Sequence, residues 1–220
     1  MRVLVVAAHP DDEILGAGAT LARHVDRGDE VHACVLSEGA TSRYADAMVS
    51  ELVDCGKKAA EVIGFTSLRF EQLPDQRLDT LPLIQVTQTI EELVDATRPD
   101  AVYTHFPWDV NSDHAVVARC VWTACRPYRF PFVKLITAFE TPSSTEWALP
   151  GERHRFEPQR FVDVSATLAR KLEAMRCYHS ELRDYPHPRS LRSLQERAAY
   201  WGSTVGVAAA EPFLVLRETW

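Results

Sequence analysis

The sequence lacks any apolar run long enough to cross a membrane, which takes about 20 consecutive apolar residues. Residues 1–8 are apolar, but the polar motif His-Pro-Asp-Asp-Glu follows at once, at positions 9–13. A secretory signal needs a longer apolar core and a small-residue cleavage site. We therefore expect a buried strand over residues 2–8, in a cytoplasmic protein without a membrane span.

Positive charge is also scarce. The 220 residues include 24 lysines and arginines against 31 aspartates and glutamates, which gives a formal net charge of −7. Proteins that bind nucleic acids need a clustered basic surface to neutralise phosphates. The composition therefore argues against a nucleic-acid partner.

Cysteine is sparse and irregularly spaced. The chain has five cysteines, an odd number, and Cys120 and Cys125 lack the C-x-x-C spacing of a structural zinc site. Cys34 lies within an apolar run. We therefore expect buried free thiols in a reducing compartment.

Apolar runs of strand length alternate with segments of helical spacing in the first half of the chain. Strands are predicted over residues 2–8, 30–37, 68–73 and 101–104, and helices over 14–27, 45–63 and 81–97. The second half predicts helices over 115–124, 166–180 and 191–201, strands over 133–140 and 161–164, a long loop over 141–158 and an edge strand over 212–217. Such alternation is typical of βαβ units. We expect one α/β domain over residues 1–220, with a mostly parallel, Rossmann-like sheet flanked by helices.

Polar residues follow three of the predicted parallel strands. His9 follows the first, Ser37 and Glu38 follow the second, and His105 follows the fourth. Ligands of such sheets bind outside the carboxyl ends of the strands. These residues should therefore share one edge of the sheet, and we expect the active site there.

The motif at positions 9–13 concentrates the groups that metal hydrolysis needs. A histidine and one aspartate can hold a divalent metal, and the other aspartate can accept a proton from water. The alternative is an ordinary helix start, where capping and the helix dipole favour carboxylates. That alternative does not account for His9.

A second cluster spans residues 105–114, again between a predicted strand and a predicted helix. His114, at its end, is placed to supply a third ligand. A lone histidine here would more often cap a helix or lie on the surface. Two such clusters at equivalent strand ends favour a metal site.

The two clusters resemble the motifs of the LmbE/PIG-L-like family of zinc-dependent de-N-acetylases. Residues 8–13 match the family's A-H-P-D-D-E turn, and Asp113 with His114 matches its later D-H pair. Further likeness continues through residues 178–181 and 202–213. Known members deacetylate N-acetylglucosamine linked to inositol, malate or antibiotic scaffolds, and some relatives cleave thiol conjugates instead.

The resemblance also implies a role for each matched side chain. The implied zinc ligands are His9, Asp12 and His114. Asp11 would be the general base, and Glu13 would order the turn. The resemblance thus assigns the site to residues from both clusters.

One position departs from the family pattern. Well-known members place a histidine three residues before the last zinc ligand, where it is thought to stabilise the oxyanion or protonate the leaving amine. This chain has Asn111 there. An amide can donate a hydrogen bond to an oxyanion but cannot act as a general acid. Either Asp11 moves the proton alone, or His105 or His187 assists. A structural role is an equal alternative for His105, and for His187 the alternative is that it braces a rigid loop between two prolines.

Other residues near the motifs allow two interpretations. Gly16 and Gly18 do not complete a G-x-G-x-x-G fingerprint, because position 21 is leucine, so close helix packing is the expected role. Residues 37–39 and Arg43 can contact a sugar or simply form a turn. Aromatic residues that can wall a sugar site, or equally belong to the core, are Phe106, Trp108 and Trp147.

The sequence therefore predicts a Zn²⁺-dependent hydrolase that removes an N-acyl group from a small molecule carrying an amino sugar, with acetyl the leading expectation. Its catalytic candidates are Asp11, Asn111 and His105. A site of two histidines and one aspartate also accepts Fe²⁺, Co²⁺ or Mn²⁺. The alternatives are a thiol-conjugate amidase of the same family and a non-catalytic, metal-containing binding protein. The sequence permits a homo-oligomer.

Overall fold

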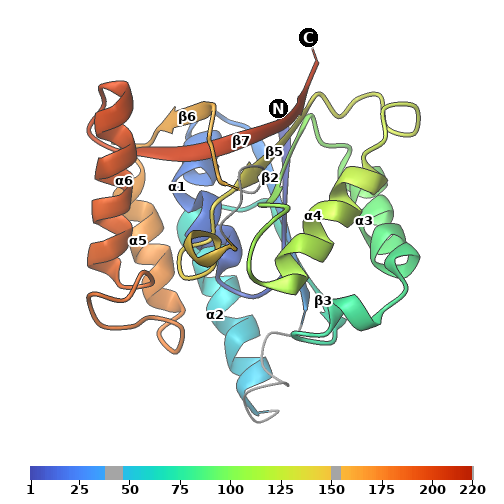
Figure 1. Cartoon of the computed structure of the whole chain (residues 1–220), viewed down its shortest axis with the longest axis horizontal. Coiled ribbons are helices and arrows are strands. Elements are labelled where there is room, and N and C mark those ends of the chain that lie inside the picture. The colour runs from blue at the N-terminus through green and yellow to red at the C-terminus, as the bar shows by residue number, and fades with distance from the viewer. Residues whose placement is uncertain (38–46, 150–154, 220) are drawn as a thin grey trace.

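A single sheet with helices on both faces forms the centre of the molecule (Figure 1). The computed structural model describes residues 1–37, 47–149 and 155–219, and in these residues the sheet has seven strands in the order β3-β2-β1-β4-β5-β7-β6. Their bounds are Arg2–Ala7 (β1), Glu30–Ser37 (β2), Ser67–Leu73 (β3), Ala101–His105 (β4), Leu135–Phe139 (β5), Arg160–Asp163 (β6) and Ala210–Glu218 (β7). Strands β1 to β5 are parallel, and β7 is antiparallel to both of its neighbours. The expected mostly parallel α/β sheet is confirmed.

The order of the parallel strands is that of a Rossmann-like sheet. The chain adds strands on one side of β1 and then returns to add β4 on the other side, so the strand order reverses between β1 and β4. Such a reversal leaves a crevice at the carboxyl ends of these two strands. His9 lies just after β1, and His105 is the last residue of β4. The topology therefore brings the two clusters of the sequence to one place.

The helices divide between the two faces of the sheet (Figure 1). One face carries α1 (Asp12–Asp26), α2 (Ala47–Ile63), α5 (Leu168–Cys177) and α6 (Leu191–Val205), and the other carries α3 (Leu83–Thr97) and α4 (Ser112–Ala124). Successive side chains of a strand point to opposite faces. Accordingly, Val3 and Val5 of β1 pack into the core beneath α1, whereas Leu4 and Val6 pack into the core beneath α3 and α4.

Helix α4 begins at Ser112, earlier than the Ala115 that apolar spacing predicts. Asn111 caps this helix, because its side-chain oxygen accepts a hydrogen bond from the backbone N–H of Asp113 at 2.9 Å. The first turn of this helix is polar, so it shows none of the regularly spaced apolar residues by which a helix is predicted. The hydrophobic pattern therefore assigns these residues to a loop. The earlier start puts His114 in the first turn of the helix, where the helix frame holds it.

Helix α1 approaches the sheet closely at Gly16. A Cβ atom at this position would lie 2.1 Å from Cδ2 of Phe139, which is far inside van der Waals contact. Gly16 is therefore needed for the packing of α1 on β5. This agrees with the expected packing role rather than with a dinucleotide fingerprint.

The expectation of an edge strand over residues 212–217 is wrong. Strand β7 lies between β5 and β6, and β6 is the edge strand on this side. Pro212 pairs with Phe161 of β6, but the ladder with β5 ends at Phe213, so Pro212 has a strand on one side only. The pattern misleads because this proline, which cannot donate to a ladder, is typical of an edge.

Short 3-10 turns follow two of the parallel strands, Leu78–Thr80 after β3 and Thr145–Trp147 after β5. The second lies inside the loop expected over 141–158, whose residues 150–154 are outside the described part. Among the described residues, no helix is long and apolar enough to cross a membrane.

Candidate metal centre and active site

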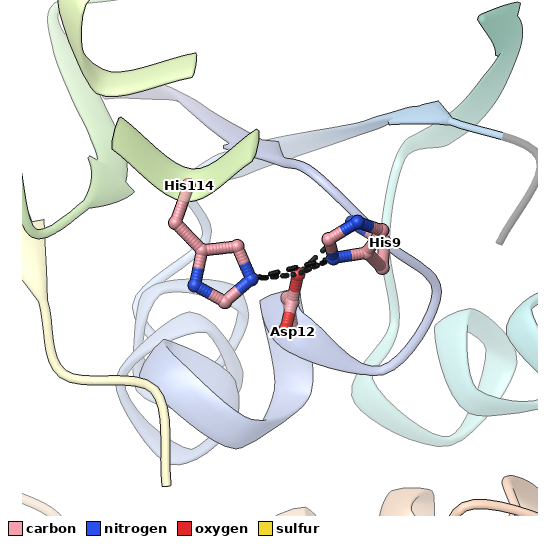
Figure 2. A group of neighbouring side chains, drawn as sticks. All are labelled: His9, Asp12 and His114. Carbon is pink, nitrogen blue, oxygen red and sulfur yellow. Dashed lines mark hydrogen bonds and ion pairs between the residues drawn. The ribbon is translucent and has the colours of Figure 1, made fainter. Parts of the chain in front are cut away.

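Three side chains that could hold a metal ion meet at the carboxyl edge of the sheet (Figure 2). His9 follows β1, Asp12 begins α1, and His114 lies in the first turn of α4. Oδ2 of Asp12 lies 3.2 Å from Nδ1 of His9 and 3.3 Å from Nε2 of His114. The two histidine nitrogens lie 3.3 Å apart. The structure thus brings together the three residues expected to bind metal.

This donor set fits a small divalent cation. Ligand atoms at about 2.0–2.1 Å from a tetrahedral zinc ion are roughly 3.3–3.4 Å apart. The three distances between the donor atoms are 3.2, 3.3 and 3.3 Å. Two imidazoles and a carboxylate are also the ligand types of catalytic zinc sites, which keep a further position for water.

Asp113 orients the first histidine ligand. Its Oδ2 lies 3.2 Å from Nε2 of His9, and its Oδ1 accepts a hydrogen bond from the backbone N–H of Leu78 at 3.0 Å. Because Nε2 faces a carboxylate, Nδ1 is left facing Asp12. Burial disfavours the imidazolium, but the hydrogen bonds to Asp113 and Asp12 outweigh it and raise the pKa of His9 to about 10. The carboxylates around His9 therefore favour a positive charge there. Either a proton on the imidazole or a bound metal ion can supply that charge.

Asp109 orients the second histidine ligand. Its Oδ1 lies 3.3 Å from Nδ1 of His114, which leaves Nε2 facing Asp12. Asp109 also accepts hydrogen bonds from the hydroxyls of Ser144 and Thr145, the latter at 2.6 Å. Both histidine ligands therefore have a buried carboxylate behind them, as ligating histidines usually do.

Asp11 adopts a left-handed backbone conformation, with φ of 99°, just before α1. Its side chain is buried, and Oδ2 has no hydrogen-bond partner among the described residues. The nearest cation is Arg189, whose Nη1 lies 3.5 Å from Oδ2. Burial and the neighbouring charge of Asp12 raise the pKa of Asp11 well above its usual range. Strained residues with perturbed pKa values are typical of functional sites.

Glu13 is buried beneath this turn. It accepts hydrogen bonds from the backbone N–H of Asp11 at 3.2 Å and from the hydroxyl of Tyr178 at 2.6 Å. Burial raises the pKa of Glu13 to about 7. Its hydrogen bonds are therefore with the turn and with Tyr178 rather than with the three candidate metal ligands.

His105 is fully buried behind His114, on which it stacks at 4.0 Å between ring centroids. Its Nε2 accepts a hydrogen bond from the backbone N–H of Ala8 at 2.8 Å, and its Nδ1 lies 3.1 Å from the hydroxyl of Thr141. Burial and the neighbouring His114 lower its pKa well below the usual range, so the ring is neutral. Both nitrogens thus have protein partners, and His105 is not among the residues that line the cavity described next.

A cavity of about 560 Å³ opens above the three ligands. Asn111, Trp147 and His187 line it, together with Asp11. The carbonyl oxygen of the Asn111 side chain caps α4, so its amide nitrogen is the group left to donate. Nδ1 of His187 accepts a hydrogen bond from the backbone N–H of Arg189 at 3.1 Å, and burial with the nearby arginine lowers the pKa of His187.

Other residues considered from the sequence are placed differently. Phe106 is fully buried, and Trp108 lines a separate surface groove next to Trp122. Ser37 is buried within β2. Residues 38–46, which include Glu38, Gly39 and Arg43, lie outside the described part of the chain.

The sequence indicated no role for several residues of the site, although Glu181 lies in a stretch of family likeness. Asp75 and Gln76 lie beside Nε2 of His9 at 3.5 and 3.1 Å, and Glu181 holds Arg189 at 2.7 Å. They come from segments after β3 and α5, far from either motif. Asp109 lies within the second cluster, and a carboxylate five residues before a histidine ligand is the one signal that could have indicated its role.

Comparison with known proteins gives the chain a family. Residues 4–125, more than half of the chain, match the family described as GlcNAc-PI de-N-acetylase, PIG-L. The matched segment contains both clusters, and so all three residues of the metal centre.

Relatives that match most of the chain have related names. An uncharacterized deacetylase of Escherichia coli K12, YaiS, is 28% identical over 167 residues, which cover 74% of this chain and 81% of that protein. A diacetylchitobiose deacetylase of Thermococcus kodakarensis is 27% identical over 223 residues, which cover 96% of this chain and 81% of that protein.

Solved structures share the fold. The conserved protein TT1542 of Thermus thermophilus superposes with a TM-score of 0.81 at 23% identity, over 99% of this chain and 96% of that one. The 4-carboxy-2-hydroxymuconate hydratase GalB of Pseudomonas putida KT2440 superposes with a TM-score of 0.76 at 19% identity, over 100% and 97%. Because a hydratase has the same fold, the fold alone does not specify the reaction.

Proposed function

Because the chain belongs to the GlcNAc-PI de-N-acetylase (PIG-L) family, we propose that it hydrolyses the N-acetyl amide of an N-acetylglucosamine-type unit in a small molecule. The products are acetate and the free amine. The observation that carries the proposal is the meeting of Asp11 with His9, Asp12 and His114 at one cavity. The names of the relatives support the substrate class.

We propose zinc as the metal, held by His9, Asp12 and His114, with Fe²⁺, Co²⁺ and Mn²⁺ as the alternatives that this donor set accepts. When bound there, the ion would activate water and polarise the amide carbonyl. Asp113 and Asp109 hold the two imidazoles so that one nitrogen of each faces Asp12.

Asp11 serves as the proton carrier of the proposed reaction. Its carboxylate accepts a proton from the attacking water and later returns it to the leaving nitrogen. Oδ2 is available for this because it has no hydrogen-bond partner among the described residues. The raised pKa of Asp11 suits a group that must hold the proton between the two transfers.

Asn111 is proposed to stabilise the negative charge that develops on the amide oxygen. Its side-chain nitrogen is the donor that remains after the oxygen has capped α4. One such donor is typically worth about 10²–10³ in rate. His187, neutral at pH 7, can donate a second hydrogen bond from its other nitrogen, but its lowered pKa argues against a role as general acid.

His105 is better assigned as a positioning residue than as a catalytic one. It stacks on the ring of His114 and joins the backbone of Ala8 to the hydroxyl of Thr141. These contacts fix the position of His114 relative to the turn that follows β1. The sequence-based expectation that His105 assists proton transfer has no support in this geometry.

We also propose the cytoplasm as the compartment. All five cysteines are free, and Cys34, Cys55, Cys120 and Cys125 are buried. Free thiols persist where the environment is reducing, which supports this assignment.

The test combines metal analysis with acetate release. The zinc-loaded protein is offered N-acetylglucosamine, N,N′-diacetylchitobiose, and N-acetylglucosamine linked to inositol or malate, with and without a chelator. We expect about one zinc per chain and acetate release that the chelator abolishes. The control is Asp95→Asn, a change of an exposed side chain on α3.

Other outcomes would replace the proposal. Amine release from a thiol conjugate without acetate release from any sugar would favour the amidase alternative. Bound metal with no hydrolysis of either kind would favour a binding protein. A protein that retains no metal under any loading condition would overturn the assignment of the metal centre.

A further inference from the structure

Trp147 is exposed to solvent on 55% of its surface and yet lines the cavity of the metal centre. A tryptophan on a protein surface forgoes a large hydrophobic contribution to folding. Its exposure at the cavity therefore suggests that the ring contacts a bound ligand. The residue belongs to the 3-10 turn Thr145–Trp147, which follows β5 at the carboxyl edge of the sheet.

One side of this turn is tied to the metal centre. Asp109 accepts hydrogen bonds from the hydroxyls of Thr145 and Ser144, and the same carboxylate lies 3.3 Å from Nδ1 of His114. Asp109 thus holds the turn and a ligating histidine at once. Any movement of the turn relative to the metal ligands would break these buried contacts.

The other side of the turn is tied to α6. Glu146 forms an ion pair with Arg197 at 2.9 Å and accepts hydrogen bonds from the backbone N–H groups of Ser143 and Ser144. Arg197 also pairs with the buried Glu140 at 2.7 Å. The backbone that carries Trp147 is therefore anchored from both sides, which keeps this exposed residue at the cavity.

Hydrogen bonds also connect the turn of Trp147 to the second histidine of the site. Oγ of Ser144 lies 3.5 Å from Nδ1 of His114, on the edge of the imidazole that faces away from Asp12. Trp147 donates its backbone N–H to Ser144, one turn further on, which is about 6 Å along a 3-10 axis. Trp147, Ser144 and His114 all line the same cavity, so the wall that Trp147 forms is continuous with the candidate ligand site. Val110, exposed on 51% of its surface, adds a second exposed apolar side chain to the same cavity.

We propose that Trp147 is the stacking platform of a second subsite, which binds a sugar ring joined by a glycosidic bond to the N-acetylglucosamine unit that is deacetylated. This inference rests on the proposed function. The C–H face of a pyranose ring is apolar and matches an indole face, while its hydroxyls can reach the polar lining at Ser143 and Ser144. A cavity of about 560 Å³ lies within the range of sites for ligands larger than one small group. The preferred substrate class is thus a glycoside of N-acetylglucosamine rather than the free monosaccharide.

The test compares two sugars and three variants. The zinc-loaded protein is assayed for acetate release from N,N′-diacetylchitobiose and from N-acetylglucosamine. We expect Trp147→Ala to lower the ratio of the two kcat/KM values roughly tenfold, chiefly through KM for the disaccharide, because stacking acts equally on bound substrate and transition state. Trp147→Phe should restore much of the ratio. The matched control is Trp122→Ala, a half-exposed tryptophan of α4 outside the cavity.

A binding measurement separates this inference from the proposed function. Disaccharide binding to Asp11→Asn protein is followed by isothermal titration calorimetry, with and without Trp147→Ala. Weaker binding in the double variant supports the subsite even if the wild type releases no acetate, which would overturn the deacetylase proposal alone. Equal binding, an unchanged substrate ratio in Trp147→Ala, or an equal loss in Trp122→Ala would overturn the subsite.

Discussion

Nε2 of His9 lies 3.2 Å from Oδ2 of Asp113, although the two residues are 104 positions apart in the chain. Asp113 is fully buried, and its other oxygen is occupied by the backbone N–H of Leu78. The carboxylate therefore has a fixed place, from which it decides which nitrogen of His9 carries the proton. The proposed binding of metal at Nδ1 of His9 depends on this choice of tautomer.

Asp113→Asn should weaken metal binding. An amide can accept the hydrogen bond of Leu78 with its oxygen, but it then presents an N–H to Nε2 of His9. The proton of the imidazole is driven to Nδ1, the nitrogen that should face the metal. We expect metal affinity to fall by about 10- to 100-fold, measured by competition with a chelating dye. Asp95→Asn is the control, and equal affinity in the two variants would contradict the role of Asp113.

Asp11→Asn should separate metal binding from turnover. Asparagine tolerates the left-handed backbone of position 11, where φ is 99°, so the turn is expected to persist. Without the carboxylate, acetate release should fall by about 10²–10⁴, the usual contribution of a general base, while metal content stays the same. His114→Ala should lose both metal and activity. Full turnover in Asp11→Asn would refute the assignment of the base.

Lys171→Met should destabilise the fold without touching the active site. Nζ of Lys171 lies 2.5 Å from Glu211, which also accepts hydrogen bonds from the backbone N–H groups of Ala19 and Thr20 in α1. All of these groups are buried, so removal of the lysine leaves an unpaired buried charge. We expect a loss of about 3–5 kcal/mol in the free energy of unfolding, measured by urea denaturation. Lys57→Met, at an exposed ion pair on α2, should change little, and similar losses in both would count against a special role for the buried pair.

Gly16→Ala should also be destabilising, because its methyl group would meet the ring of Phe139. Overpacking of this kind costs about 1–3 kcal/mol, and each 1 kcal/mol should lower Tm by about 2–4 °C in a chain of this size. Phe139→Leu removes the obstructing ring. In the double variant, the loss should therefore be smaller than the sum of the two single losses. Additive losses would show that the glycine is not required by this contact.

Trp147→Ala should affect substrate choice more than stability, since the ring is exposed on 55% of its surface. Its Tm should stay close to that of the wild type, measured by circular dichroism alongside the kinetic comparison described above. A large loss of stability would show that the ring supports the turn rather than the substrate.

The local part of the site was predictable from the sequence. The motif at positions 9–13 directly follows a strongly apolar strand, and Asp113 with His114 lies at a helix start, so residue type and position in the βαβ pattern were sufficient to predict that both clusters share one edge of the sheet. The assignment of His9, Asp12 and His114 as ligands came from the family resemblance and stays a prediction. The parallel arrangement of the first four strands followed from the same alternation. In each case the signal lies within a few neighbouring residues, where apolar period and turn chemistry act directly.

Only the tertiary structure decided what surrounds those ligands. Arg189, Gln76 and Trp147 come from connections far apart in the chain, and their approach to one cavity depends on the packing of the sheet and of α6. His105 was one of two histidines considered for proton transfer, with a structural role as an equal alternative, and packing puts it behind His114 with both of its nitrogens engaged. Strand β7 was misplaced for the same reason, since its neighbours are chosen by long-range pairing rather than by its own residues. The sequence by itself determined, through local patterns, which candidate ligands follow the strands, while contacts between distant segments decided their supporting residues and the shape of the cavity.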